Sequence, residues 1–268
     1  MELTLEQKIE RVKDLRPIDD VFFETLAGEK AVCQEILRTI LEDKELIVEE
    51  VITQSSLRNI YGKSVRLDAL CILGNGERAN IEVQRSDNDN HLKRARYNAA
   101  SITVKDSNAG DDYGKIPEVI VVYISEFDFL HGGKTTYHID KVIRETGETV
   151  DDGLKEIFVN TVNDDGSDTA DLMSCFTKKQ VNNPKFPNLS SEVSRLKNTE
   201  GGLNAVCMVM QKYENIARNE GIQQGMQQSM TASILNLMSS MQISQEKAME
   251  LLMIPKDDFS KYSQLLKS

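Results

Sequence analysis

The chain contains no tryptophan, four cysteines, five prolines and three histidines in 268 residues. The cysteines are scattered without a C-x-x-C spacing, so neither a zinc site nor a disulfide framework is indicated, and reduced core thiols fit the pattern. The histidines are too few and too far apart to indicate a zinc enzyme. The G-x-S-x-G and H-E-x-x-H motifs of serine hydrolases and zinc proteases are also missing.

Long apolar runs and positive charge are scarce too. The first residues, MELTLEQKIERVKD, are charged and unlike a secretory leader, and no later run is long enough to cross a membrane. We therefore expect a cytoplasmic protein without membrane contact. There are 32 Lys and Arg residues against 43 Asp and Glu, which gives a net charge of −11. That sign is unfavourable for contact with DNA phosphates, although local charge matters more than the total.

Residues 65–84, read VRLDALCILGNGERANIEVQ, have the pattern of a β-hairpin. Apolar and polar residues alternate on both sides of a central G-N-G, whose residues accept the positive φ of a hairpin turn. Side chains alternate between the two faces of a strand, so Glu82 and Gln84 share one face, and Asp68 can meet them from the first strand. Two carboxylates and an amide oxygen form a hard, oxygen-rich site that suits Mg²⁺ or Mn²⁺.

Asp68 followed by Glu82-Val83-Gln84 resembles the D…(D/E)-x-K signature of the PD-(D/E)XK nuclease superfamily. More narrowly, it resembles the Rpn-type recombination-promoting nuclease and transposase family, in which the last position is commonly Gln. The resemblance extends to the flanking segments PIDDVFF at 17–23, RARY at 94–97 and the stretch 110–124, and so covers roughly the first 160 residues. The order of these pieces makes the similarity more specific than the short D…E-x-Q element alone.

The resemblance implies a restriction-endonuclease-like α/β fold, a mixed sheet flanked by helices. The residue pattern gives the same class. It predicts helices at 3–14, from a cap at Asp19 or Asp20 to 26, at 30–41 and at 87–105. It predicts strands at 48–54, 57–61, within the hairpin, and at 117–124, 135–143 and 154–159. The run PEVIVVYI at 117–124 is typical of a strand buried on both faces.

Three regions are predicted along the chain: a nuclease-like core at 1–165, a linker with short helices at 166–200, and a helical region at 201–268 for oligomerisation or DNA contact. The stretch NNPKFPN, with its two prolines, is typical of a boundary or an arm. Helices are predicted at 189–197, 203–228, 232–241, 243–253 and 259–266. The Gln- and Gly-rich stretch NEGIQQGMQQSM carries no sustained heptad, which leaves a coiled coil open.

The resemblance implies that Asp68 and Glu82 hold the divalent cation against a DNA phosphate, and that hydrolysis leaves a 3′-hydroxyl and a 5′-phosphate. Each acid lies in an apolar strand, where burial without a partner is costly. The residues alone leave open an exposed position for either acid, or a structural ion pair of Asp68 with Arg66 or Arg85.

Gln84 stands where the superfamily usually has a lysine. Gln can orient water through hydrogen bonds but brings no charge, so another cation compensates, or the reaction is slow, or the site is inactive. The family's frequent use of Gln favours compensation, while a solvated residue at a strand end is the other interpretation.

Arg94 and Tyr97 on the helix at 87–105 are the candidates for compensation. They lie three residues apart and share a face, and the resemblance implies that an Arg and a Tyr of this helix point to the site. A solvated basic face with a core tyrosine is the alternative. His91, one turn earlier, is interpreted as a surface histidine rather than a base.

Asp20 and Glu24 share a face of the second helix. In many superfamily members an acid from the first core helix completes the metal site, and Asp20 matches the family's D-x-x-F pattern together with Phe23. Asp20 is therefore a candidate third metal ligand, with an N-cap as the alternative role.

Three functions fit these observations. The first is a Mg²⁺- or Mn²⁺-dependent DNA endonuclease linked to recombination or mobile elements, and a homodimer because double-strand cutting takes two active sites. The second is a catalytically weak or inactive nuclease-fold module that binds protein or regulates DNA transactions, favoured by the net charge and by Gln84. The third is a regulatory or toxin–antitoxin role.

Overall fold

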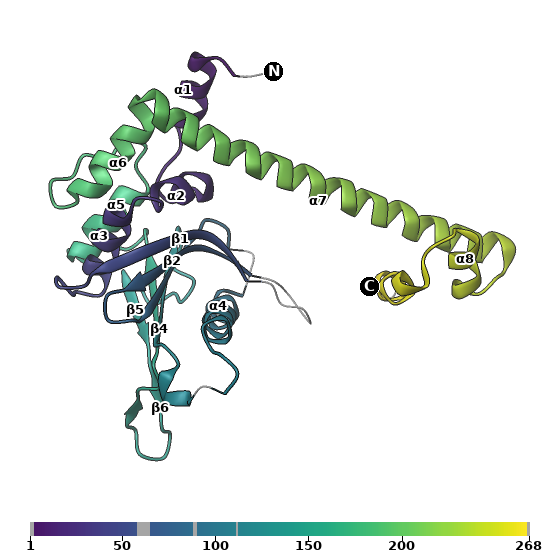
Figure 1. The fold of residues 1–268 in the computed structure, drawn as a ribbon, viewed down its shortest axis with the longest axis horizontal. Coiled ribbons are helices and arrows are strands. Elements are labelled where there is room, and N and C mark those ends of the chain that lie inside the picture. Colours follow the sequence, from purple (N-terminus) through teal and green to yellow (C-terminus); the bar gives the residue numbers. More distant parts are fainter. Residues whose placement is uncertain (1–2, 58–64, 88–89, 111, 267–268) are drawn as a thin grey trace. The chain divides into compact units, whose positions relative to one another are not determined.

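The computed structural model describes residues 3–57, 65–87, 90–110 and 112–266 (Figure 1). The chain forms two compact units, Met1–Met210 and Gln211–Ser268. Most of the strand predicted at 57–61 falls on residues 58–64, which lie outside the described residues.

A mixed six-stranded sheet with the order β1-β2-β3-β4-β8-β5 forms the centre of the first unit. Its strands are β1 (Val48–Leu57), β2 (Val65–Leu73), β3 (Arg78–Gln84), β4 (Val119–Ser125), β5 (Thr136–Ile139) and β8 (Leu154–Asn160). Strands β3, β4 and β8 are parallel, and the other pairs are antiparallel. The short strands β6 (Lys141–Val142) and β7 (Thr149–Val150) pair separately.

Strands β2 and β3 form the predicted hairpin. Gly76 in its turn has a φ of 90°, a conformation that glycine adopts without strain. Ala69 pairs with Ile81, so continuing the antiparallel ladder by one residue places Asp68 opposite Glu82. Strand β4 is buried at every position, as predicted from its continuous apolar run.

Helices cover both faces of the sheet (Figure 1). The main core lies between one face and the helices α1 (Leu5–Lys13), α2 (Asp20–Leu26), α3 (Lys30–Ile40), α5 (Asp168–Phe176) and α6 (Pro187–Asn198). Helix α4 (His91–Lys105) packs on the opposite face through Ala95, Ala99 and Ile102. The 3-10 helix η1 (Tyr113–Lys115) precedes β4. Helices on both sides of a mixed sheet confirm the predicted α/β class.

Lys197 of α6 is a buried lysine, with 8% of the residue exposed. Its Nζ donates to the carbonyl of Lys13 at 3.0 Å and also to the carbonyls of Leu15 and Lys179. It lies 5.2 Å from the centre of the Phe22 ring. Burial lowers the pKa of Lys197 to about 8, because the charged ammonium group is costly to bury. The hydrogen bond to the Lys13 carbonyl links α6 to the end of α1.

Some predicted boundaries were wrong. The helices predicted at 203–228 and 232–241 are one helix, α7 (Glu200–Met241), because the intervening residues 229–231, Ser-Met-Thr, include neither proline nor glycine. The strand predicted at 135–143 divides into β5 and β6, which belong to different sheets. Helix α4 begins at His91 and not at 87, because the Asn90 side chain caps it by accepting from the Lys93 amide.

The second unit contains the C-terminal part of α7, α8 (Gln245–Leu251), the 3-10 helix η2 (Lys256–Asp258) and α9 (Phe259–Leu265). They share a small core around Ile234, Ala248 and Met249. The predicted limits at 165 and 200 stay a prediction, and in the structure α5 and α6 contribute Phe176 and Leu189 to the core of the first unit. Among the described helices, none combines the length and the hydropathy of a membrane span.

Candidate functional site

Two buried carboxylates face each other across β2 and β3. Asp68 is 9% exposed and Glu82 is fully buried. The Asp68 amide donates to Glu82 Oε1 at 3.2 Å, and the Val83 amide donates to Asp68 Oδ2 at 3.1 Å. Each side chain therefore accepts a hydrogen bond from the backbone of the other strand, which holds the two acids together at the end of β3.

Burial raises the pKa of both acids. The pKa of Asp68 lies well above its usual range because the carboxyl is desolvated and because the Glu82 carboxylate is close. The pKa of Glu82 is also raised by desolvation, against the opposing charge of Arg94. Two desolvated acids, one of which raises the pKa of the other, form a place where an added cation is stabilised.

Arg94 of α4 connects this pair to Gln84. Its Nη2 donates to Glu82 Oε2 at 3.2 Å, and its Nη1 donates to Gln84 Oε1. The Gln84 amide in turn donates to the Ser86 carbonyl at 2.8 Å. The structure therefore places Glu82 and Gln84 on one face, with Arg94 supplying the positive charge that Gln84 lacks.

Asn80 is a further member that the sequence analysis missed. It is fully buried, and its Nδ2 donates to Glu82 Oε1 at 3.0 Å. Its Oδ1 has no hydrogen-bond partner among the described residues. Alternation along β3 could have indicated Asn80, because it lies two residues before Glu82 and so on the same face.

Asp20 lies at the first position of α2, and its N-cap is Asp19, whose side chain makes no capping hydrogen bond. Desolvation raises the pKa of Asp20, and the charges of Arg94 and Arg85 oppose that rise. Asp20 also raises the pKa of Asp68, so the two carboxylates are within electrostatic reach. The structure gives no direct contact that assigns Asp20 as a ligand, and its metal role stays a prediction.

Arg85 does not pair with Asp68. Its Nη1 lies 2.7 Å from Asp19 Oδ1 and its Nε lies 3.0 Å from Glu126 Oε2. Arg16 completes the ring, with Nη1 2.6 Å from Glu126 Oε1 and Nη2 3.3 Å from Asp19 Oδ1. This four-membered network fixes the start of α2 to the ends of β3 and β4. Arg16 and Asp19 are three residues apart, but Arg85 and Glu126 come from distant segments, so no local pattern could have indicated the whole network.

His91 is buried at 4% exposure, so its interpretation as a surface residue was wrong. Its ring lies 5.1 Å and 4.8 Å from the rings of Phe127 and Phe129. Its Nδ1 lies 3.0 Å from the Tyr123 hydroxyl and its Nε2 lies 3.1 Å from Asp87 Oδ1. Against desolvation, the charges of Glu82 and then Tyr123 raise the pKa of Arg94, so this aromatic cluster lies within electrostatic reach of the arginine.

Tyr97 is half-buried and lines a hollow of about 400 Å³ between α4 and β1, together with Leu57 and Val104. Glu24 is buried in α2 on the side of the main core. The predicted roles of both residues stay predictions.

The donor set suits a hard divalent cation. Asp68 and Glu82 provide carboxylate oxygens, and Gln84 provides an amide oxygen, which are the ligand types that Mg²⁺ and Mn²⁺ prefer. Within the described residues, however, no group of three or more His, Cys, Asp or Glu side chains is arranged to hold a metal ion. A bound ion would therefore depend on the two acids, on Gln84 and on water.

No curated protein and no solved structure matches the chain. The model of the PD-(D/E)XK nuclease family transposase matches residues 17–170, a span that contains Asp20, Asp68, Glu82 and Arg94. The six-stranded mixed sheet flanked by helices is the restriction-endonuclease-like fold expected of such proteins. The chain belongs to the PD-(D/E)XK nuclease family transposases.

Proposed function

We propose that the chain is a metal-dependent DNA endonuclease that acts in recombination or on mobile elements. The observation that supports this most is the buried pair of Asp68 and Glu82, held by each other's backbone and approached by Arg94. Burying two carboxylates side by side is energetically unfavourable unless a positive charge compensates, and a bound divalent cation would supply that charge. Mg²⁺ or Mn²⁺ is the proposed ion, and DNA is the proposed substrate.

The residues divide the proposed work among them. Asp68 and Glu82 would hold the ion, and Asp20 is the candidate for a further carboxylate. When bound, the ion would neutralise charge on a phosphate oxygen and lower the pKa of a water molecule. Gln84 can orient a water through its amide, and the Arg94 guanidinium can stabilise negative charge on the phosphate.

The test is cleavage of supercoiled plasmid by the full chain in Mg²⁺ or Mn²⁺, compared with Asp68→Asn and Glu82→Gln. Both variants are expected to lose cutting, and the wild-type ends are expected to be closed by DNA ligase, which needs a 5′-phosphate and a 3′-hydroxyl. Glu50→Gln on the exposed face of β1 is the matched control and should cut normally. Failure of the wild type to cut with either ion would refute the enzyme.

A second candidate function is a nuclease-fold module that binds protein or regulates DNA transactions without cutting. Arg94 favours it, because its ion pair with Glu82 already neutralises part of the charge that a metal would neutralise. A thermal-shift titration with Mn²⁺ separates the two, because a ligand that binds only the folded state raises the melting temperature. A shift that Asp68→Asn abolishes supports the enzyme, and no shift in the wild type supports the module.

A homodimer is part of the proposal, because cutting both strands takes two active sites. The mass of the full chain in solution, measured by light scattering with and without DNA, tests this. A monomer that produces only nicks would agree with the proposed nuclease activity and would contradict the proposed homodimer.

A further inference from the structure

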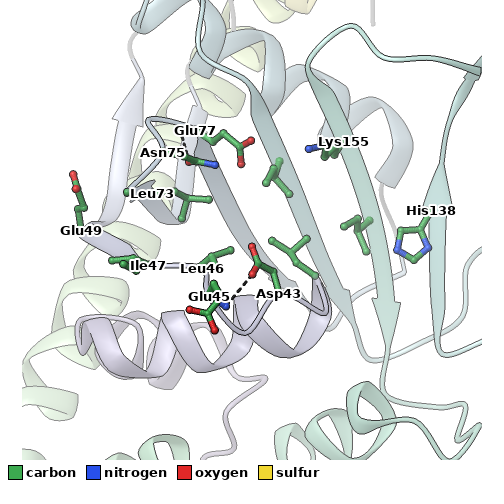
Figure 2. Close-up of a pocket in the computed structure, with 14 residues that line it drawn as sticks. Asp43, Glu45, Leu46, Ile47, Glu49, Leu73, Asn75, Glu77, His138 and Lys155 are labelled. Carbon is green, nitrogen blue, oxygen red and sulfur yellow. Dashed lines mark hydrogen bonds between the residues drawn. The ribbon is translucent and has the colours of Figure 1, made fainter.

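A hollow of about 660 Å³ lies at the other end of the sheet from the carboxylate pair. Strand β3 runs from Arg78 to Gln84, so Glu77 marks one end and Glu82 lies near the other. Figure 2 shows the hollow bordered by the loop after α3, by the β2–β3 turn, and by Lys155 and His138. None of the residues in the proposed catalytic set lines it.

The floor of the hollow is apolar. Leu73, Ile120 and Ile157 form it, and these three also belong to the main core of the first unit. Leu46 borders them at 8% exposure, while Ile47 on the rim is 57% exposed. The apolar surface that solvent reaches at this place therefore lies mainly on Ile47, above a floor that is almost fully buried, and covering it would be favourable.

The rim of the hollow is acidic. Four carboxylates lie on it: Asp43, Glu45, Glu49 and Glu77. No cation pairs with any of the four within the described part of the chain, whereas elsewhere on the surface Lys141 pairs with Asp152 and Lys185 with Asp168. Lys155 is the one lysine among the lining residues, and it lies 3.6 Å from Glu118. Unpaired like charges around one opening favour a positively charged occupant.

These two properties together select the occupant. A bare divalent ion would make no use of an apolar floor, and the described residues hold no group of three carboxylates placed for one. A Lys- or Arg-containing peptide meets both demands, because its cationic heads reach the rim while an apolar side chain covers the floor. A volume of about 660 Å³ also falls within the roughly 300–1,000 Å³ of ordinary ligand sites.

We propose that this hollow binds a basic segment of a partner protein, which inserts an apolar side chain between two or more Lys or Arg residues. The inference goes beyond the nuclease function and does not depend on it. It also assigns a binding role to part of the chain's excess of acidic residues.

The test is a selection of random 12-residue peptides displayed on yeast, with the full chain as the bait. The selected peptides are expected to carry Lys or Arg on both sides of Leu, Ile, Phe or Met. One such peptide, synthesised with a fluorescent label, is then titrated with the chain and followed by fluorescence anisotropy. Its affinity should fall as salt rises, because exposed charges are screened.

Matched variants separate the hollow from general acidity. The triple variant Glu45→Gln, Glu49→Gln and Glu77→Gln is expected to bind the labelled peptide at least tenfold more weakly. Its control makes the same change in charge at exposed acids elsewhere: Glu6→Gln, Glu145→Gln and Glu246→Gln. Ile47→Ser, at an exposed position where folding tolerates the change, should weaken binding severalfold by removing apolar surface.

Several results would overturn the proposal. One is a selection without a basic and apolar consensus, and another is equal binding by the triple variant and its control. Displacement of the peptide by spermine as readily as by unlabelled peptide would show that charge alone is recognised. Self-association of the chain that the triple variant abolishes would assign the hollow to a second copy instead.

Discussion

Replacing Arg94 with Met should separate metal binding from turnover. Arg94 is the cation that contacts Glu82, whose side chain is fully buried, and it also binds Gln84. Removing one member of a buried ion pair typically costs about 3–5 kcal/mol, because a charge is left without its partner. The Arg94 side chain is 31% exposed, so we expect a smaller loss of roughly 2 kcal/mol. For a unit of this size, that loss corresponds to a fall of about 4–8 °C in melting temperature.

The effect of Mn²⁺ on the same variant should have the opposite sign. Without the guanidinium, Glu82 Oε2 loses a competing hydrogen-bond donor and becomes available to an ion. The stabilisation by Mn²⁺ should therefore be larger in Arg94→Met than in the wild type. Plasmid cutting should nevertheless fall by roughly a hundredfold, since a preorganised donor to negative charge has been lost.

The assay is thermal unfolding of the full chain followed by far-UV circular dichroism, with and without Mn²⁺, beside the plasmid assay. Arg96→Met is the control, because Arg96 is exposed two residues further along the same helix. Adding Glu82→Gln to Arg94→Met should recover part of the lost stability, since no charge is then left buried. The reasoning is refuted if Arg94→Met melts within a degree of the wild type and shows the same Mn²⁺ shift.

Three further predictions concern other parts of the first unit. The pKa of Lys197 is about 8 in the folded protein and 10.5 in the unfolded chain, so between these pH values the unfolded chain binds more protons. The free energy of unfolding should therefore rise with pH in this range. The gain from pH 7 to 9, measured by urea unfolding relative to Lys197→Met, should be about 1 kcal/mol, and equal slopes for both proteins would contradict it. Gly202→Ala should destabilise by at least about 1–3 kcal/mol, since its Cβ would lie 2.3 Å from the Arg195 carbonyl oxygen. Gly201→Ala, with nothing within 4 Å, should instead stabilise α7 by up to about 1 kcal/mol, and similar melting temperatures for the two variants would argue against this account. Tyr123→Phe removes the partner of His91 Nδ1 and should cost about 1 kcal/mol while lowering cutting more than Mn²⁺ binding, which the plasmid and thermal-shift assays measure together. A loss of Mn²⁺ binding that matches the loss of cutting would contradict an effect of Tyr123 on cutting through Arg94.

The central hairpin could be predicted because its determinants are local. A turn that accepts positive φ, with alternating residues on both sides, sets the register and so places Asp68 opposite Glu82. The buried strand β4 could be predicted for a similar reason, from a continuous apolar run. The proposed catalytic roles of these residues rest on the resemblance and await the assays.

What the sequence could not supply are contacts between distant segments. The burial of His91 depends on Phe127 and Phe129, which follow β4 and fold back over the start of α4. The pairing of Arg85 with Asp19 and Glu126 joins three separate segments. Helical spacing indicated that Arg94 has a defined face, but no pattern shows that this face meets Glu82. The predicted break within α7 was wrong because residues 229–231, Ser-Met-Thr, have only modest helix propensity and include no residue that ends a helix.

The bond between Arg94 and Gln84 has a consequence for how this motif can change over time. A lysine at position 84 would bring an ammonium group close to the Arg94 guanidinium, and the two positive charges would repel each other. In the structure Arg94 contacts the neutral Gln84 and the acidic Glu82. Restoring the superfamily's usual residue by Gln84→Lys alone should therefore displace the Arg94 side chain from the site, so that the site does not gain a second positive charge. Substitutions at positions 84 and 94 are therefore expected to occur together. The site then keeps a single cationic side chain, which comes either from strand β3 or from helix α4.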